Sequence, residues 1–321
     1  MSKQLPQLDD DQIQIVLDSL SEVVLGAGAD YEAVITWSGF YSPAPRLDAT
    51  EWRTYIGALL NGQSASSIEQ LALVLLPART ALDWASVPAG SSWQWQLQGE
   101  LNTTYSADFY DVDLFDTPVA TISQLQQQGS KVICYFSAGS YEEWRDDADD
   151  FPLSTLGTPL DGWPGERWLD IRATAVWEVM ASRLDVAMEK GCDAVEPDNI
   201  DGYINEPGFS LTASDQLAYN QYLAIQAHLR GLAIGLKNDL DQVQSLVEFF
   251  DFALNEQCHE FEECDLLLPF VAANKAVFIA EYDDFFRGQG FAELCKSSAE
   301  NSFSSMVLSL ELNDSFRLEC D

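Results

Sequence analysis

Three carboxylates crowd into the segment VEPDNIDGY, which spans residues 195–203. They are Glu196, Asp198 and Asp201, and they come at the end of an apolar run. Carboxylates can cleave a glycosidic bond, because one carboxyl group protonates the leaving oxygen while a second attacks the sugar or activates water. The same three acids could instead bind Mg²⁺ or Ca²⁺, or they could serve only as caps of a loop.

Other reaction chemistries find little support in the residues of this chain. There are only two histidines, His228 and His259, and no CxxC pair, which argues against a zinc site. No Cys-His or Ser-His pairing suggests acyl transfer. We therefore expect two-carboxylate chemistry with neither a metal ion nor a cofactor.

The elements that position these acids become regular from about residue 90 onward. Short apolar runs rich in Val, Ile, Phe and Tyr alternate with segments of helical pattern such as 172–190, which Gly191 ends, and 214–230. Eight runs are predicted as strands: 93–97, 108–116, 131–139, 192–199, 232–239, 250–257, 275–282 and 305–312.

Eight strand–helix units in residues 89–321 favour an α/β fold of the closed (β/α)8 TIM-barrel type. The alternative is an open doubly wound sheet, but its GxGxxG fingerprint is missing after the first strand. Residues 1–88 lack this alternation of strand and helix patterns and are predicted to form an N-terminal extension of mixed, mainly helical pattern. We expect the extension to pack on the barrel, with a separate binding module as the alternative.

In a barrel of this type the chemistry lies at the carboxyl ends of the strands. Nearly every predicted strand ends in an ionisable or amide side chain, and Asp198 and Glu256 end two of them. Tryptophans near this rim could serve as platforms for the apolar faces of sugars. The predicted substrate-binding residues are Asp116, Tyr135, Trp163, Glu196, Asn199, Asp201, Lys237, Asn238, Glu281 and Tyr282.

The charge of the chain excludes some partners. There are 52 acidic and 16 basic residues, a formal net charge of −36, which argues against nucleic acid and, more weakly, against anionic lipid. The charge indicates either solubility in a salty habitat or attraction of a cationic partner. No apolar run is long enough for membrane insertion. The start, MSKQLPQLDD, lacks a signal-peptide pattern, which indicates an intracellular protein or a mature fragment.

Six cysteines permit three disulfides without proving them. Cys258 and Cys264 flank a short acidic loop and could close it, and Cys295 and Cys320 could staple the C-terminus. The two remaining cysteines, Cys134 and Cys192, lie in or beside predicted strands and are expected to be buried thiols.

The ordered motifs of residues 90–285 resemble glycoside hydrolase family 114, the endo-α-1,4-polygalactosaminidases. The motifs are WQWQLQGEL, DVDLFDT, VICYFSAGSYEEWR, GWPGERWLDIR, GCDAVEPDNIDGY, GLKND, FALNEQC and AEYD. The resemblance implies a (β/α)8 barrel that hydrolyses α-1,4-linked galactosamine polymers. It also implies a catalytic Asp in the EPDN block, here Asp198, and a catalytic Glu in the NEQC block, here Glu256.

The resemblance implies a cationic polysaccharide as partner, because de-N-acetylated galactosamine carries an ammonium group that an acidic cleft would attract. Glu196 and Asp201 would then support Asp198 or contact the sugar amine. Family members are typically secreted, so an extracellular location is expected, and we expect a monomer. Analogy with retaining α-galactosidases, whose acids lie on the same two strands, favours a retaining mechanism. A non-catalytic polysaccharide-binding barrel and an acidic extracellular matrix protein are the alternatives.

Overall fold

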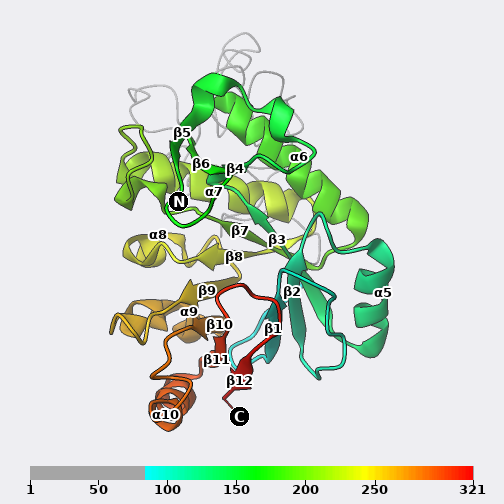
Figure 1. Cartoon of the computed structure of the whole chain (residues 1–321), viewed down its shortest axis with the longest axis vertical. Helices are drawn as coiled ribbons and strands as arrows, with labels where there is room; N and C mark the ends of the chain where they lie inside the picture. The colour runs from blue at the N-terminus through cyan, green and yellow to red at the C-terminus, as the bar shows by residue number, and fades with distance from the viewer. Residues whose placement is uncertain (1–83, 321) are drawn as a thin grey trace, which may run out of the picture. The chain divides into compact units, whose positions relative to one another are not determined.

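Eight parallel strands form the centre of the structure, a computed structural model that describes residues 84–320 (Figure 1). In the order of the sheet they are β1 (Trp93–Gln96), β2 (Phe109–Asp113), β3 (Lys131–Ser137), β7 (Ala194–Asp198), β8 (Ala233–Lys237), β9 (Phe252–Glu256), β10 (Val277–Glu281) and β11 (Ser304–Leu308). Each strand overlaps a run predicted from the sequence, and the predicted barrel is confirmed. Residues 1–83 of the predicted N-terminal extension lie outside the described residues.

The first and last parallel strands lie side by side where the sheet curls round on itself. Trp93 Nε1 donates a hydrogen bond to the carbonyl oxygen of Ser304 (2.9 Å), and Ser304 Oγ donates to the carbonyl of Ser91 (2.7 Å). A further strand, β12 (Arg317–Glu319), pairs antiparallel with β11, and Arg317 Nε donates to the side chain of Gln94 on β1 (2.6 Å). Side chains and β12 therefore join the two edges of the barrel.

Helices surround this sheet and connect its strands (Figure 1). In the described residues no helix lies between β1 and β2, and β12 replaces a helix after β11, so the strand–helix repeat is incomplete at both ends. The helices are α5 (Val119–Gln128), α6 (Thr174–Lys190), α7 (Ala213–Leu229), α8 (Val243–Leu246), α9 (Leu268–Ala272) and α10 (Phe291–Asn301).

The two long helices, α6 and α7, lie within one or two residues of the ranges 172–190 and 214–230 predicted from the sequence. Thr212 accepts a hydrogen bond from the backbone N–H of Asp215, whose side chain accepts from the Thr212 N–H, so α7 starts with a capping box. Helix α6 ends at Gly191, which adopts a left-handed conformation (φ 83°) that glycine tolerates without strain. The apolar residues that α6 presents at helical spacing are buried, except that Met188, near the end of the helix, is 46% exposed.

A small antiparallel sheet between β3 and α6 was not predicted. It consists of β4 (Ser140–Glu142), β5 (Leu156–Pro159) and β6 (Glu166–Leu169), in the order β4-β6-β5. Each strand is only three or four residues long, which is too short for an alternating pattern to stand out in the sequence.

The interior of the barrel is apolar at the amino ends of the strands and polar at the carboxyl ends. Alternate residues of a strand face the same side of a sheet, so one inward row of β7 reads Ala194, Glu196, Asp198 and one of β9 ends in Glu256. The apolar floor contains Trp93, Phe109, Ile133, Ala194, Ala233, Phe252, Phe278 and Met306, all buried. Acids placed above this floor share a volume from which water is largely excluded.

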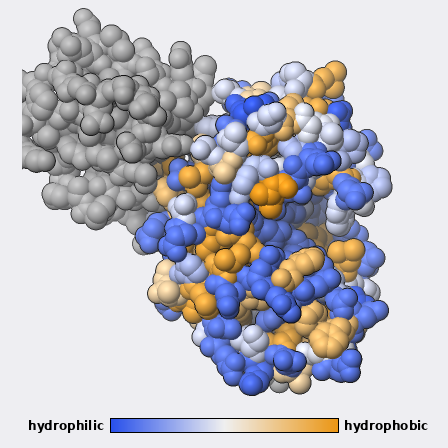
Figure 2. Space-filling model, turned by 90° about the vertical axis from the view of Figure 1, so that its left-hand side faces the viewer, coloured by the Kyte–Doolittle hydropathy of each residue, from blue (hydrophilic) through white to orange (hydrophobic). Residues whose placement is uncertain are grey.

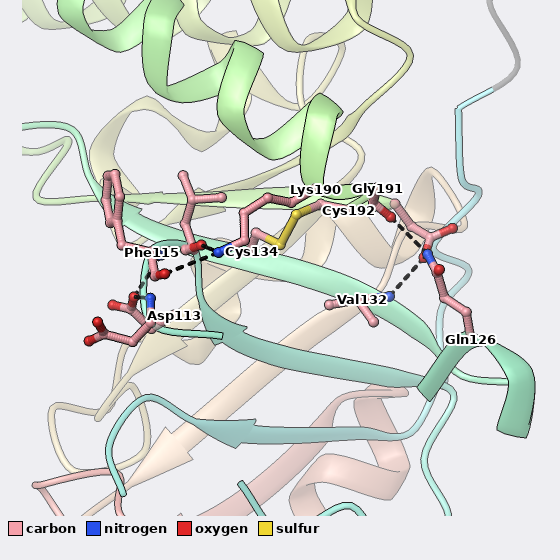
Figure 3. The surroundings of a disulfide bond; sticks show 11 residues. Asp113, Phe115, Gln126, Val132, Cys134, Lys190, Gly191 and Cys192 are labelled. Atoms are coloured by element: carbon pink, nitrogen blue, oxygen red, sulfur yellow. Dashed lines mark hydrogen bonds between the residues drawn. A yellow bond between two sulfur atoms is a disulfide. The ribbon is translucent and has the colours of Figure 1, made fainter. Parts of the chain in front are cut away.

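Three disulfides join the six cysteines: Cys134–Cys192, Cys258–Cys264 and Cys295–Cys320. The last two are the pairs considered possible from the sequence, whereas the expectation that Cys134 and Cys192 are free buried thiols was wrong. Figure 3 shows how the Cys134–Cys192 bond joins β3 to the chain just after α6. The helix returns the chain beside β3, which brings two cysteines 58 residues apart to a Cα–Cα distance of 6.0 Å.

Removing the Cys134–Cys192 bond is expected to lower the free energy of unfolding more than removing the Cys258–Cys264 bond does. By the chain-entropy model, closing the 58-residue loop contributes about 4 kcal/mol, and closing the six-residue loop about 2 kcal/mol. Thermal unfolding of the two double Cys→Ala variants measures the difference. Equal losses would contradict this account.

Hydrophilic residues cover most of the described surface in Figure 2, and apolar residues interrupt it in patches. Among the described residues, no helix combines the length and the apolar character needed to cross a bilayer.

Candidate active site

The carboxyl ends of β7, β8 and β9 bring two acids and one lysine into direct contact. Lys237 Nζ lies 3.1 Å from Asp198 Oδ1 and 3.3 Å from Glu256 Oε2. The Lys237 side chain is 2% exposed, whereas those of Asp198 and Glu256 are 19% and 26% exposed. The two carboxylates therefore line an accessible surface, and the ammonium group lies beneath them.

Each of these three strands is followed at once by a residue in the left-handed region of backbone space. Asn199 has φ 60°, Asn238 has φ 51° and Gln257 has φ 67°. Asparagine tolerates this conformation better than most residues. The chain thus leaves the barrel immediately after the functional side chain, which remains the last residue held by the sheet.

Asp198 accepts hydrogen bonds from three different elements. Tyr135 Oη of β3 donates to Oδ2 (3.1 Å), the backbone N–H of Asn199 donates to Oδ1 (2.8 Å), and Lys237 contacts Oδ1. These contacts together hold the Asp198 carboxyl group in a fixed orientation.

A buried polar chain supports the turn that carries Asn199. Asn199 Nδ2 donates to Ser137 Oγ (3.0 Å), which lies 2.6 Å from Ser140 Oγ, and Ser140 Oγ donates to Glu166 (2.6 Å). Burial raises the pKa of Glu166 to about 7. A Cβ atom at Gly139 would collide with the backbone of Asn199, so only glycine permits this close approach.

Glu256 has a different set of partners. Tyr282 Oη donates to Oε1 (2.6 Å), and Asn238 Nδ2 lies 3.5 Å from Oε2. Asn238 Oδ1 also accepts from the Glu256 backbone N–H (3.0 Å) and from Asn255 Nδ2 (3.1 Å). Asn238 thus fixes the end of β9, and Tyr282 holds the Glu256 side chain.

Lys237 is a buried cation surrounded by acids. It donates to Glu196 Oε1 (2.9 Å) and lies over the Trp95 ring, 4.8 Å from its centroid. Burial alone would lower the pKa of Lys237, but the surrounding carboxylates, Asp198 first among them, raise it well above its usual value. Burial raises the pKa of Glu196 to about 7, against the opposing effect of Lys237.

The shared lysine limits the distance between the two exposed carboxylates. Asp198 Oδ1 and Glu256 Oε2 cannot be farther apart than about 6.4 Å, the sum of their distances to Lys237 Nζ. Carboxyl pairs of retaining glycosidases are about 5–5.5 Å apart, and those of inverting enzymes about 6.5–9.5 Å. The geometry is that of two acids able to act on the same bond.

Lys237 argues against the alternative in which Glu196 and Asp198 bind a divalent metal ion. Its ammonium group takes the position that a metal cation would need between these two acids. Cys258, His259 and Cys264 lie close together, but both cysteines form a disulfide and offer no thiolate.

Three predicted substrate-binding residues do not contact this cluster. Glu281 is fully buried and accepts a hydrogen bond from the His259 backbone N–H (2.8 Å), so it holds the loop after β9, and burial raises its pKa to about 7. Asp116 lies beyond the end of β2 with its side chain 83% exposed. Trp163 is 45% exposed in the loop between β5 and β6.

Asp201 follows the Asp198 turn and immediately precedes the short 3-10 helix Gly202–Ile204. Burial, and next the charge of Asp198, raise its pKa to about 6. It therefore lies within the electrostatic reach of the cluster.

The sequence did not reveal two buried groups beside the cluster. Asp111 of β2 is fully buried under Glu196 and Lys237. Arg145 donates to Asp113 Oδ2 (2.7 Å) and contacts Glu142 Oε1 (2.8 Å), in a buried ion-pair network that braces the loops after β2 and β3. The alternation of FYDVD, with acids two residues apart, is the one signal that could have indicated Asp111.

A parallel barrel with two partly exposed acids at the carboxyl ends of β7 and β9 defines the class of the protein: a barrel enzyme of the glycoside hydrolase type. The model of glycoside hydrolase family GH114 matches residues 75–321. The chain therefore belongs to family GH114 and is a glycoside hydrolase, which confirms the family predicted from the sequence motifs.

Solved structures agree with this assignment. The chain is 40% identical to the crystallised Ega3 of Aspergillus fumigatus, in complex with galactosamine, with a TM-score of 0.71 over 74% of this chain and 98% of that chain. The glycoside hydrolase domain of PelA from Pseudomonas aeruginosa, 14% identical, has a TM-score of 0.57 over 71% of this chain and 98% of that chain, a likeness of fold alone. The search of curated proteins gave no match.

Proposed function

We propose that this protein is an endo-acting hydrolase of α-1,4-linked galactosamine polymers, with Asp198 and Glu256 as its catalytic pair. The observation that carries the proposal is the contact of both carboxylates with one buried ammonium group at the carboxyl face of the barrel. The 40% identity with Ega3, whose structure contains galactosamine, supports an amino sugar as substrate.

In the proposed mechanism Asp198 is the nucleophile and Glu256 the acid/base. Glu256 gives its proton to the glycosidic oxygen while a carboxylate oxygen of Asp198 attacks the anomeric carbon, so the leaving chain departs and a glycosyl ester forms. Glu256 then takes a proton from water, which attacks the same carbon and releases Asp198. The three donors to Asp198 support the nucleophilic role, because they hold its carboxyl group in one orientation at the accessible face of the barrel.

The product is expected to keep the α configuration. The analogy with retaining α-galactosidases, whose acids lie on the same two strands, favours retention, and the shared contact with Lys237 keeps the two carboxylates close together. Proton NMR of the first-formed product, recorded before mutarotation, measures the outcome. An initial β-anomer would overturn the retaining mechanism and leave the catalytic pair itself untouched.

The acidity of the chain is proposed to attract the cationic polymer. Raising the ionic strength from about 0.05 M to about 0.5 M is then expected to raise KM several-fold, because salt screens the field, with little change in kcat. A fully N-acetylated oligomer, which carries no ammonium group, is the matched control and should show no such trend. Equal salt responses of the two substrates would favour the solubility interpretation of the charge.

Incubation with partly deacetylated α-1,4-galactosamine polymer tests the function directly. Mass spectrometry is expected to show a ladder of short oligomers from the earliest times, since an endo-acting enzyme cuts within the chain. Binding of the polymer without any cleavage would instead support the non-catalytic binding barrel.

An extracellular site of action is part of the proposal. Three disulfides in the described residues support it, because such bonds persist in oxidising compartments. The monomeric state and the assignment of residues 1–88 to an N-terminal extension stay predictions.

A further inference from the structure

A pair of acids lies beneath the proposed catalytic residues, out of reach of any substrate. Asp111 of β2 and Glu196 of β7 are both fully buried in the barrel interior. Phe109, two residues before Asp111, and Ala194, two residues before Glu196, belong to the apolar floor. The alternation of each strand therefore places both acids one step above that floor and beneath Lys237.

The oxygens of this pair lack ordinary donors. Among the described residues, neither oxygen of Asp111 and not the Oε2 atom of Glu196 receives a hydrogen bond from an N–H or hydroxyl group. Glu196 Oε1 accepts from Lys237, and the two carboxyl groups lie within hydrogen-bonding range of each other. Buried polar oxygens without partners are costly, and a proton between the two carboxyl groups would satisfy them.

The excess of acids over cations favours the same proton. Four acids, Asp111, Glu196, Asp198 and Glu256, surround the ammonium group of Lys237, and the charge of Asp201 lies within electrostatic reach. The neutral polar groups that face these acids are the hydroxyls of Tyr135 and Tyr282, the side-chain amide of Asn238 and the backbone N–H of Asn199. Two close carboxylates in a dry site cannot both stay ionised, and such pairs share one proton. Burial, and next the charge of Glu196, raise the pKa of Asp111 well above its usual value.

We propose that Asp111 and Glu196 share one proton, and that Asp111 is a positioning residue for Lys237 and, through it, for Asp198 and Glu256. With the proton in place the pair carries one negative charge, which Lys237 balances by its 2.9 Å contact with Glu196. Lys237 is then free to hold both upper acids. Without the proton a second buried negative charge would draw the ammonium group down, away from Asp198 and Glu256.

Two substitutions at Asp111 separate a shared proton from an ionised Asp111. In Asp111→Asn the neutral amide donates to Glu196 as the protonated acid does, so kcat and the melting temperature are expected to stay close to those of the wild type. In Asp111→Ala the donor is lost, and kcat is expected to fall by about 10-fold to 100-fold, while KM changes little because Asp111 does not touch substrate. The activity readouts rest on the proposed function.

Infrared difference spectroscopy at pH 7 supplies a readout that needs no substrate. The wild type minus Asp111→Asn spectrum is expected to contain the C=O band of one protonated carboxylic acid. Asp113→Asn is the matched control: Asp113 lies two residues along the same strand but is bound to Arg145 (2.7 Å). This variant is expected to lose stability, and its difference spectrum should show carboxylate bands only.

The outcomes distinguish this inference from the proposed function. A wild type that fails to cleave the polymer would overturn the function, while the infrared band and the melting temperatures still decide the shared proton. Absence of the protonated band, or a loss in Asp111→Asn as large as that in Asp111→Ala, would show that Asp111 is ionised and would overturn the inference. If Asp111→Ala does not fold, the band and the stability of Asp111→Asn remain decisive.

Discussion

Replacing Asp198 by asparagine or Glu256 by glutamine is expected to lower kcat by a factor of about 100 to 10,000. Each change removes a charge at nearly constant shape, and both side chains are partly exposed, so the melting temperature should change little. Initial rates on α-1,4-galactosamine polymer, together with thermal unfolding, measure both quantities. Near wild-type turnover in either variant would show that the residue is not catalytic.

A control and a chemical probe sharpen this test. Glu293→Gln makes the same substitution at an exposed position of α10 and is expected to leave kcat unchanged. Added azide can replace a missing nucleophile. We expect Asp198→Ala with azide to yield a β-glycosyl azide, because azide attacks from the face that Asp198 occupied. Glu256→Ala should yield the α-azide by intercepting the glycosyl ester, and the reverse pattern would exchange the two roles.

Replacing Lys237 by methionine is expected to have the largest effect on stability. It leaves Glu196, Asp198 and Glu256 without their common cation, and loss of one partner from a buried ion pair typically lowers the free energy of unfolding by about 3–5 kcal/mol. We also expect hydrolysis to be lost, since both carboxylates depend on the same ammonium group for their position.

The pH dependence identifies the cause of that loss. In the variant the folded acids hold protons more tightly than the unfolded ones, so the deficit should be small near pH 4.5 and grow as pH rises through their folded pKa values. Lys275→Met is the matched control, because Lys275 is a partly buried lysine whose ammonium group donates to the carbonyls of Val247 and Phe250 rather than to a carboxylate in the described residues. A deficit of Lys237→Met that does not vary with pH would contradict the electrostatic explanation.

The barrel could be predicted from sequence because its strands and helices have different periods. Helix α7 begins after the local signal Thr212, and helix α6 ends at the local signal Gly191. Both signals depend only on neighbouring residues. The small β4-β6-β5 sheet could not be predicted, since its pairing depends on contacts between short segments. The Cys134–Cys192 bond depends in the same way on the path of 58 residues.

Within the site, the residues predicted at strand ends come together where the last residue of a strand faces inward. Asp198, Lys237 and Glu256 do so, and both acids contact the lysine. Glu281 also ends a strand, but its neighbours Ala280 and Tyr282 pack with the barrel interior, so Glu281 faces outward. A strand end recognised in the sequence indicates how far along the barrel axis a residue lies. Only the register of the strand decides whether its side chain faces the barrel interior or the surrounding helices.

The left-handed turns at Asn199, Asn238 and Gln257 separate what is rigid in this enzyme from what can vary. The proposed catalytic groups belong to the sheet, while the residues that would contact the rest of a long polymer belong to the loops that start one residue later. Loops tolerate insertion and exchange far better than strands. Related enzymes could therefore diverge in their preference for the length or the acetylation of the polymer by loop exchange alone. A designer could graft loops between them without changing the residues at the strand ends.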